Sequence, residues 1–176
     1  MWALVENNSV TRVYTRPTAI TVGDINYPQN IMSMWTASEL EAIGIYEVVS
    51  DGTNLKSSSY YYNGAESFNF ADGVVTRSYG IATAKNLAVL KTQKKEFINE
   101  EAGMLLKPTD WYVLRATEGG TATPSAITTY RAAVRTKSNE MFTLIDNAAN
   151  VDALAALYVW NEDDPPTRPL GEFPLL

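Results

Sequence analysis

The sequence predicts an α+β protein: a β-rich N-terminal domain of hairpins or a meander with one short helix, then a helical hairpin and an extended proline-rich arm. Short segments with strand-like alternation, separated by Asn and Gly turns, fill the first 80 residues. Apolar residues then recur at helical spacing up to about residue 158. Four of the eight prolines fall in the last sixteen residues. We therefore expect domains over 1–80 and 81–160, followed by an arm over 161–176.

The N-terminal segments read as two consecutive hairpins. Trp2–Glu6 and Val10–Tyr14 flank Asn7–Ser9, which is a compact turn signal. Ala19–Val22 and Ile25–Pro28 form a second extended pair around a Gly-Asp turn.

A short helix follows with clear start and stop signals. Thr36 and Glu39 have the spacing of a capping box, in which each side chain bonds the backbone of the other. Gly44 suits the residue after the helix end, and Ile45–Val49 then predicts a strand.

The middle of the chain, from Ser57 to Thr83, is rich in tyrosine. Strands are expected at Tyr60–Tyr62, Phe68–Phe70 and Val74–Tyr79, joined by Asn-Gly and Asp-Gly dipeptides that favour type I′ turns. One interpretation is a β-meander with aromatic cross-strand pairs. The other is an aromatic platform of Tyr60, Tyr61 and Tyr62 that binds a sugar or a partner protein.

The second half predicts two long helices. The first covers about residues 82–106 and ends before Pro108, with an apolar stripe at Leu87, Leu90, Phe97, Met104 and Leu105. The second has Thr123 as N-cap and Pro124 at its first position. Its stripe is Ile127, Tyr130, Val134, Met141 and Ile145. Asn150 can cap a last helix over Val151–Tyr158.

Composition argues against several classes of function. The chain has no histidine and no cysteine, which removes disulfides, Cys-type zinc sites and Ser-His or Cys-His dyads. We expect no enzyme activity, no cofactor and no metal. A carboxylate glycosidase using Glu39 and Asp24 would need the two groups about 5 to 10 Å apart. The net charge of −6 argues against nucleic-acid binding. Neither a signal peptide nor a membrane-spanning segment is expected.

Aromatic and arginine side chains gather between Asp110 and Arg135. Arg131 and Arg135 lie four residues apart on the second long helix, beside Tyr130. They predict either an exposed face that bonds a carboxylate such as Asp110, or a protein-contact patch, because Tyr, Trp and Arg are favoured at interfaces. Trp111 and Tyr112, which follow a Pro-Thr-Asp turn, are expected to pack under the two-helix unit, and an edge that they leave exposed makes them candidates for the same patch.

The pattern Leu106…Asp110-Trp111…Tyr130-Arg131…Arg135 resembles the C-terminal segment of bacteriophage tail-fibre assembly proteins and related tail-associated proteins. The match covers about residues 105–146. Residues 1–49 are also similar to a module that recurs in phage tail and virion proteins, with Trp2–Val5, Tyr27-Pro28 and Trp35. The Pro/Gly-rich linker that often precedes the segment in that family is absent, and the family brings no catalytic residue.

The resemblance implies a structural protein of the phage tail, at the fibre or its attachment, made in the host cytoplasm and located in the virion. Its partners would be other tail or virion proteins and copies of itself, with no nucleic acid and no membrane. Two alternatives stay open. One is an assembly chaperone that is absent from the particle, and the other is a capsid decoration protein.

Overall fold

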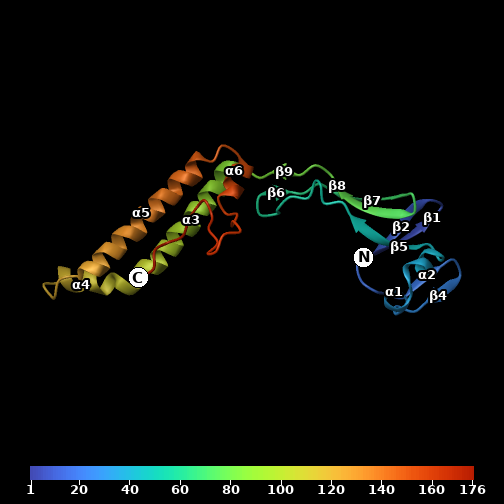
Figure 1. Cartoon of the computed structure of the whole chain (residues 1–176), viewed down its shortest axis with the longest axis horizontal. Coiled ribbons are helices and arrows are strands. Elements are labelled where there is room, and N and C mark those ends of the chain that lie inside the picture. Colours follow the sequence, from blue (N-terminus) through green and yellow to red (C-terminus); the bar gives the residue numbers. More distant parts are fainter. The chain divides into compact units, whose positions relative to one another are not determined.

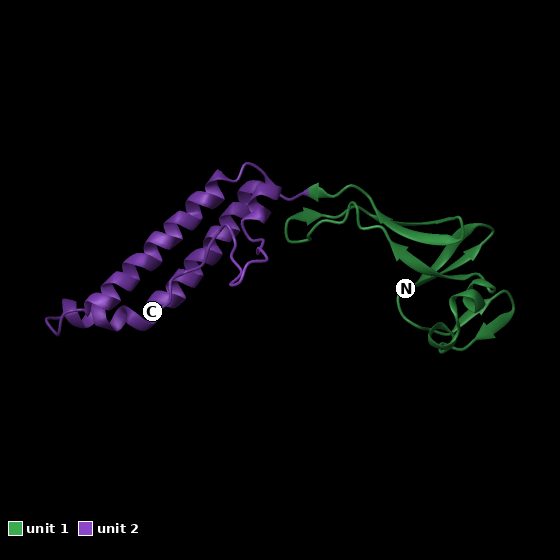
Figure 2. Cartoon of the chain, viewed as in Figure 1, with its two compact units in different colours: residues 1–83 green, residues 84–176 purple.

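The computed structural model describes residues 1–176, and these form two compact units, Met1–Thr83 and Ala84–Leu176 (Figure 2). The first unit is rich in strands with short helices, and the second is helical. The predicted α+β class is therefore confirmed. The last sixteen residues belong to the second unit.

A five-stranded sheet is the framework of the first unit. Its order is β2-β1-β5-β8-β7, and the predicted β1–β2 and β7–β8 hairpins are both present. Positive φ angles at Asn7, Asn8, Asp72 and Gly73 give the two tight turns their shape. The strands are β1 (Trp2–Glu6), β2 (Ser9–Tyr14), β5 (Ile45–Ser50), β7 (Glu66–Ala71) and β8 (Val74–Tyr79).

The sheet is not a simple meander, because β5 and β8 run parallel. Val48 lies opposite Val75 in this pairing. Parallel strands need a crossover connection, and the chain between β5 and β8 supplies it. Tyr46 and Phe70 form an aromatic contact with ring centroids 4.7 Å apart. The meander expected over residues 60–79 is present only in part, because Glu66–Ala71 pairs with Val74–Tyr79 whereas Tyr61–Tyr62 pairs with Thr83–Ala84.

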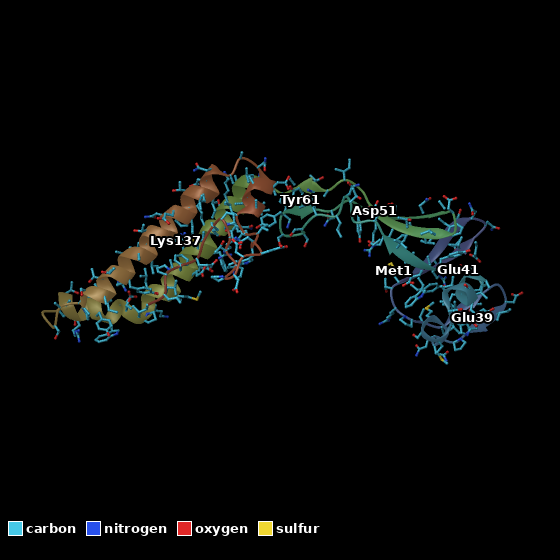
Figure 3. All side chains as sticks on the ribbon, in the orientation of Figure 1. Met1, Glu39, Glu41, Asp51, Tyr61 and Lys137 are labelled. Atoms are coloured by element: carbon cyan, nitrogen blue, oxygen red, sulfur yellow. The ribbon has the colours of Figure 1, made fainter.

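A second hairpin and two short helices enclose the core of this unit. They are β3 (Ile20–Val22), β4 (Ile25–Tyr27), α1 (Ile31–Met34) and α2 (Ala37–Glu41), and α1 was not predicted. The predicted capping box of α2 is confirmed: the Glu39 carboxylate accepts from the Thr36 backbone N–H at 2.8 Å. Glu39 is labelled on α2 in Figure 3. The buried core residues are Leu4, Tyr14, Ile20, Ile31, Met32, Leu40 and Ile45.

The predicted Asn63-Gly64 hairpin is absent. The Asn63 side chain instead bonds the backbone N–H and C=O of Lys56, both at 2.9 Å. Gly64 packs on the backbone of Gly80, and a Cβ at Gly64 would lie 2.5 Å from the Gly80 carbonyl carbon. The tyrosine run therefore contributes only the two-residue strand β6 (Tyr61–Tyr62), which pairs with β9 (Thr83–Ala84).

An antiparallel helical hairpin of α3 and α5 forms the second unit (Figure 1). Its helices are α3 (Leu87–Leu106), the 3-10 turn η1 (Lys107–Thr109), α4 (Asp110–Thr117), α5 (Ser125–Asn147) and α6 (Val151–Ala156). Asn150 caps α6 as predicted. Pro124, not Thr123, is the residue before α5, and the Thr123 hydroxyl donates to the Tyr112 carbonyl at 3.2 Å.

The two long helices differ in how well their buried faces were predicted. All five residues of the predicted α5 stripe are buried. On α3, however, the buried residues are Leu90, Ile98 and Ala102, whereas Phe97 and Met104 are 59% and 66% exposed. Apolar residues occur on two sides of α3, and contact with α5 selects one side.

The proline-rich tail forms no helix or strand, but it packs along the hairpin and is not a free arm. Leu170 is buried, and its N–H donates to the Leu157 carbonyl at 3.0 Å. Phe173 packs against Tyr130 and Val134. No helix in the structure has both the length and the apolar character that crossing a membrane requires.

Candidate protein-contact surface

Arg131 joins the three helical segments at one end of the hairpin. Its Nη1 donates to the Leu106 carbonyl at 2.9 Å and to Thr109 Oγ1 at 2.6 Å. The same nitrogen lies 2.8 Å from Asp110 Oδ1. The last carbonyls of a helix have no partner within that helix, so Arg131 satisfies one of those of α3. We call this group of four residues the Arg131 clamp.

The clamp partly agrees with the sequence prediction. Arg131 does bond Asp110, as one interpretation expected. It does not lie on an exposed face, because only 8% of the residue is accessible. The Thr109 hydroxyl donates to the Leu106 carbonyl at 2.7 Å while it accepts from Arg131. All three oxygens face Arg131 Nη1, so they share the two N–H groups of that nitrogen.

Tyr130 and Arg135 lie on the same helix but differ in exposure to solvent. Tyr130 is buried, and its hydroxyl donates to the Leu105 carbonyl at 3.4 Å. Arg135 is exposed, and its only polar contact is a 3.5 Å bond to the Arg131 carbonyl. Tyr130 and Arg131 are therefore internal supports, and neither is available to a partner. Arg135 remains available.

The clamp fixes the start of α4, where the sequence predicted a turn followed by an apolar segment. Proline is tolerated in the first turn of a helix, so Pro108 sits in η1 and α4 follows directly. The Trp111 and Tyr112 rings lie 3.8 Å apart between centroids. The Arg115 guanidinium lies 4.8 Å from the Trp111 ring and 5.6 Å from the Tyr112 ring. These contacts order the aromatic pair.

Helix α4 has no buried residue. Three of its large apolar side chains are exposed: Trp111 at 50%, Val113 at 40% and Leu114 at 62%. We call these three residues the α4 surface. Val113 and Leu114 were not predicted as site residues, because the segment was not recognised as a helix. The sequence signal that could have identified them is the run of four residues without a charge between Asp110 and Arg115.

The three candidate tyrosines lie in the other unit and do not form one platform. Tyr60 is buried, and that burial raises the pKa of its phenol. Tyr61, labelled in Figure 3, is half-buried, with the Lys56 ammonium 5.5 Å from its ring centroid. Only Tyr62 is largely exposed. The structure thus removes Tyr60 from the candidate contact residues.

No arrangement in the structure indicates a metal centre. No group of three His, Cys, Asp or Glu side chains is placed to hold an ion. Glu39, one of the two carboxylates considered for a glycosidase, is engaged in the α2 capping box. Among the features described above, the α4 surface is therefore the candidate functional site.

Comparisons with protein-family models, with curated proteins and with solved structures found no match.

Proposed function

We propose that the chain is a structural protein of a phage tail, at the fibre or its attachment, that works through protein–protein contacts. In this proposal it is made in the host cytoplasm and located in the virion. The α4 surface is its principal contact with another tail protein. The resemblance of residues 105–146 to tail-fibre assembly and tail-associated proteins supports the phage context.

The exposure of α4 is the observation that carries the proposal. A short helix in which no residue is buried gains little from packing, yet this helix presents Trp111, Val113 and Leu114 to solvent. Trp111 and Leu114 are three residues apart and share one face of the helix. Exposed apolar side chains grouped on a folded protein mark interaction sites, and Trp is enriched at interface centres. The Arg131 clamp holds the helix in place before binding, so a partner does not have to order it.

This arrangement gives a role to the residues that carry the resemblance. Asp110, Tyr130 and Arg131 bond within the chain. They are therefore positioning residues, and Trp111 is the member of the pattern that reaches the surface. Contact by apolar side chains is also consistent with the proposed partners, which are virion proteins and not nucleic acid. The net charge of −6 agrees with this.

A mass-spectrometric inventory of gradient-purified particles of the source phage tests the proposal. The copy number of the chain is measured against the major capsid protein. The proposal expects the chain in particles at tail-like copy number, far below that of the capsid protein. Copy numbers close to that of the capsid protein would indicate a decoration protein. Absence from particles despite expression in infected cells would indicate an assembly chaperone.

A further inference from the structure

The outer face of α3 carries an exposed set of side chains with coiled-coil spacing. Phe97, Glu100 and Met104 on α3 and Lys107 at its C-cap follow one another at intervals of three, four and three residues. Lys107 continues the helical geometry, because its N–H donates to the Gly103 carbonyl. Residues with this spacing share one face of a helix. All four are exposed. We call them the α3 seam.

The charges of the α3 seam have no partner within the chain. Neither Glu100 nor Lys107 takes part in an intramolecular ion pair. Beside Met104, a Cβ built on Gly103 would have no atom within 4 Å. The helix backbone is therefore open to close approach at this point.

From this pattern we infer that the α3 seam binds the α3 seam of a second copy of the chain, with the two helices antiparallel around Met104. Placing Met104 of each copy at the two-fold axis brings opposite charges together. Glu100, four residues before the axis, then lies within one residue of the partner's Lys107, three residues after it. The offset is about 1.5 Å along the helix, well within side-chain reach. Two such pairs form per dimer.

The same register also brings the two copies of Met104 together. Met104 meets the partner's Met104 beside Gly103, where no side chain blocks approach. A parallel, in-register pair would instead place Glu100 against Glu100 and Lys107 against Lys107, and like charges in contact destabilise a helix pair. Charge complementarity therefore selects a second copy in the antiparallel orientation.

The inference does not depend on the phage context. Trp111, Val113 and Leu114 are not part of the α3 seam, so the dimer leaves the α4 surface to another protein. Failure of self-association would leave the proposed function standing, and absence of the chain from particles would leave the dimer standing.

Single-cysteine crosslinking of the full chain tests the inference, because the native sequence has no cysteine. Met104→Cys should form a disulfide-linked dimer under oxidised glutathione, at least about tenfold faster than the exposed off-seam control Asn99→Cys. Circular dichroism confirms that both variants fold. Equal rates for the two variants would overturn the inference.

Mixing two variants determines the orientation. Glu100→Cys and Lys107→Cys proteins should crosslink to each other faster than either crosslinks to itself. Preferential self-linkage of Glu100→Cys would indicate a parallel pair and contradict the inference.

Sedimentation of charge variants completes the test. The native chain should show a concentration-dependent dimer. Glu100→Lys should weaken it about tenfold, and the double variant Glu100→Lys with Lys107→Glu should restore it. A native chain that remains monomeric at about 0.1 mM, or a double variant no better than the single one, would overturn the inference.

Discussion

Arg131 on α5 and Asp110 at the start of α4 are joined by a 2.8 Å ion pair between Nη1 and Oδ1. The two residues are unequal partners, because Arg131 is buried and Asp110 is largely exposed. The pair itself therefore adds little to stability. The bonds from Arg131 to Leu106 and Thr109 matter more, because these polar groups are partly or fully enclosed.

Replacing Arg131 by Met should lower the free energy of unfolding of the helical unit by about 1 to 3 kcal/mol, because the Thr109 hydroxyl loses its donor and the Leu106 carbonyl loses one of its two donors. Denaturant titration followed by helical circular dichroism measures this. The matched control is Arg135→Met on the same helix, which should change stability by less than about 0.5 kcal/mol, since that side chain is exposed. Equal effects of the two substitutions would contradict the role given to the clamp.

The two apolar residues at adjacent positions on α3 should respond very differently to truncation. Ile98 is 2% exposed and Phe97 is 59% exposed. Ile98→Ala should cost about 2 to 5 kcal/mol because it leaves a cavity between α3 and α5. Phe97→Ala, measured at a concentration where the chain is monomeric, should cost less than about 1 kcal/mol. A larger loss of stability for Phe97→Ala than for Ile98→Ala would indicate that Phe97 belongs to the buried face of α3, as the sequence predicted.

The first unit should lose stability in acid through two hydrogen-bonded carboxylates. Bonds from the Thr36 backbone and hydroxyl lower the pKa of Glu39, and bonds from the Thr53 hydroxyl and backbone lower the pKa of Asp51. A carboxyl with a depressed pKa stabilises the folded state above its unfolded-state pKa, and the effect is lost as the pH falls through the folded-state pKa. The loss should therefore begin as the pH falls below about 4.5.

Urea midpoints between pH 6 and pH 3 check this expectation. Glu39→Gln and Asp51→Asn should each reduce the fall in urea midpoint between pH 6 and pH 3, and the double variant should reduce it further. The charge-neutralised Glu41→Gln serves as control, since no hydrogen bond to its carboxylate is present. If the urea midpoint fell by the same amount in the double variant as in the native chain, groups other than Glu39 and Asp51 would cause the acid sensitivity.

Local signals in the sequence predicted much of the fold. Thr36 and Glu39, and Asn150 before α6, identified helix starts because capping depends on neighbouring residues alone. The α5 stripe was predicted correctly because its apolar residues lie on one side only. The parallel β5–β8 pairing and the buried face of α3 depend on contacts between distant segments. No local pattern contains that information.

The candidate site was predicted in part for the same reason. The pattern of Asp110, Trp111, Tyr130 and Arg131 lies at the end of the hairpin that carries the α4 surface. The four residues differ in burial: Tyr130 and Arg131 are buried, whereas Trp111 is exposed. The two buried residues therefore position the exposed one. Val113 and Leu114 were missed because Pro108 suggested a break where the chain in fact begins another helix.

Polar substitution of the α4 surface should separate binding from stability. Leu114→Ser and Val113→Ser should each change the free energy of unfolding by less than about 1 kcal/mol, because both side chains are exposed. Incorporation of the protein into particles should nevertheless fall. Complementation with tagged variants, followed by quantification of the tag in purified particles, measures this. A normal amount of the double variant in particles would argue against the α4 surface as the principal contact.

Photo-crosslinking from position 114 tests the central claim most directly. A photoreactive amino acid replaces Leu114 in the full chain, and the protein is allowed to assemble into particles before illumination. The account predicts a covalent adduct with another tail protein, and none from the control position Asn139, which is exposed on α5. Crosslinking from Asn139 but not from position 114, in particles that contain the protein, would contradict it.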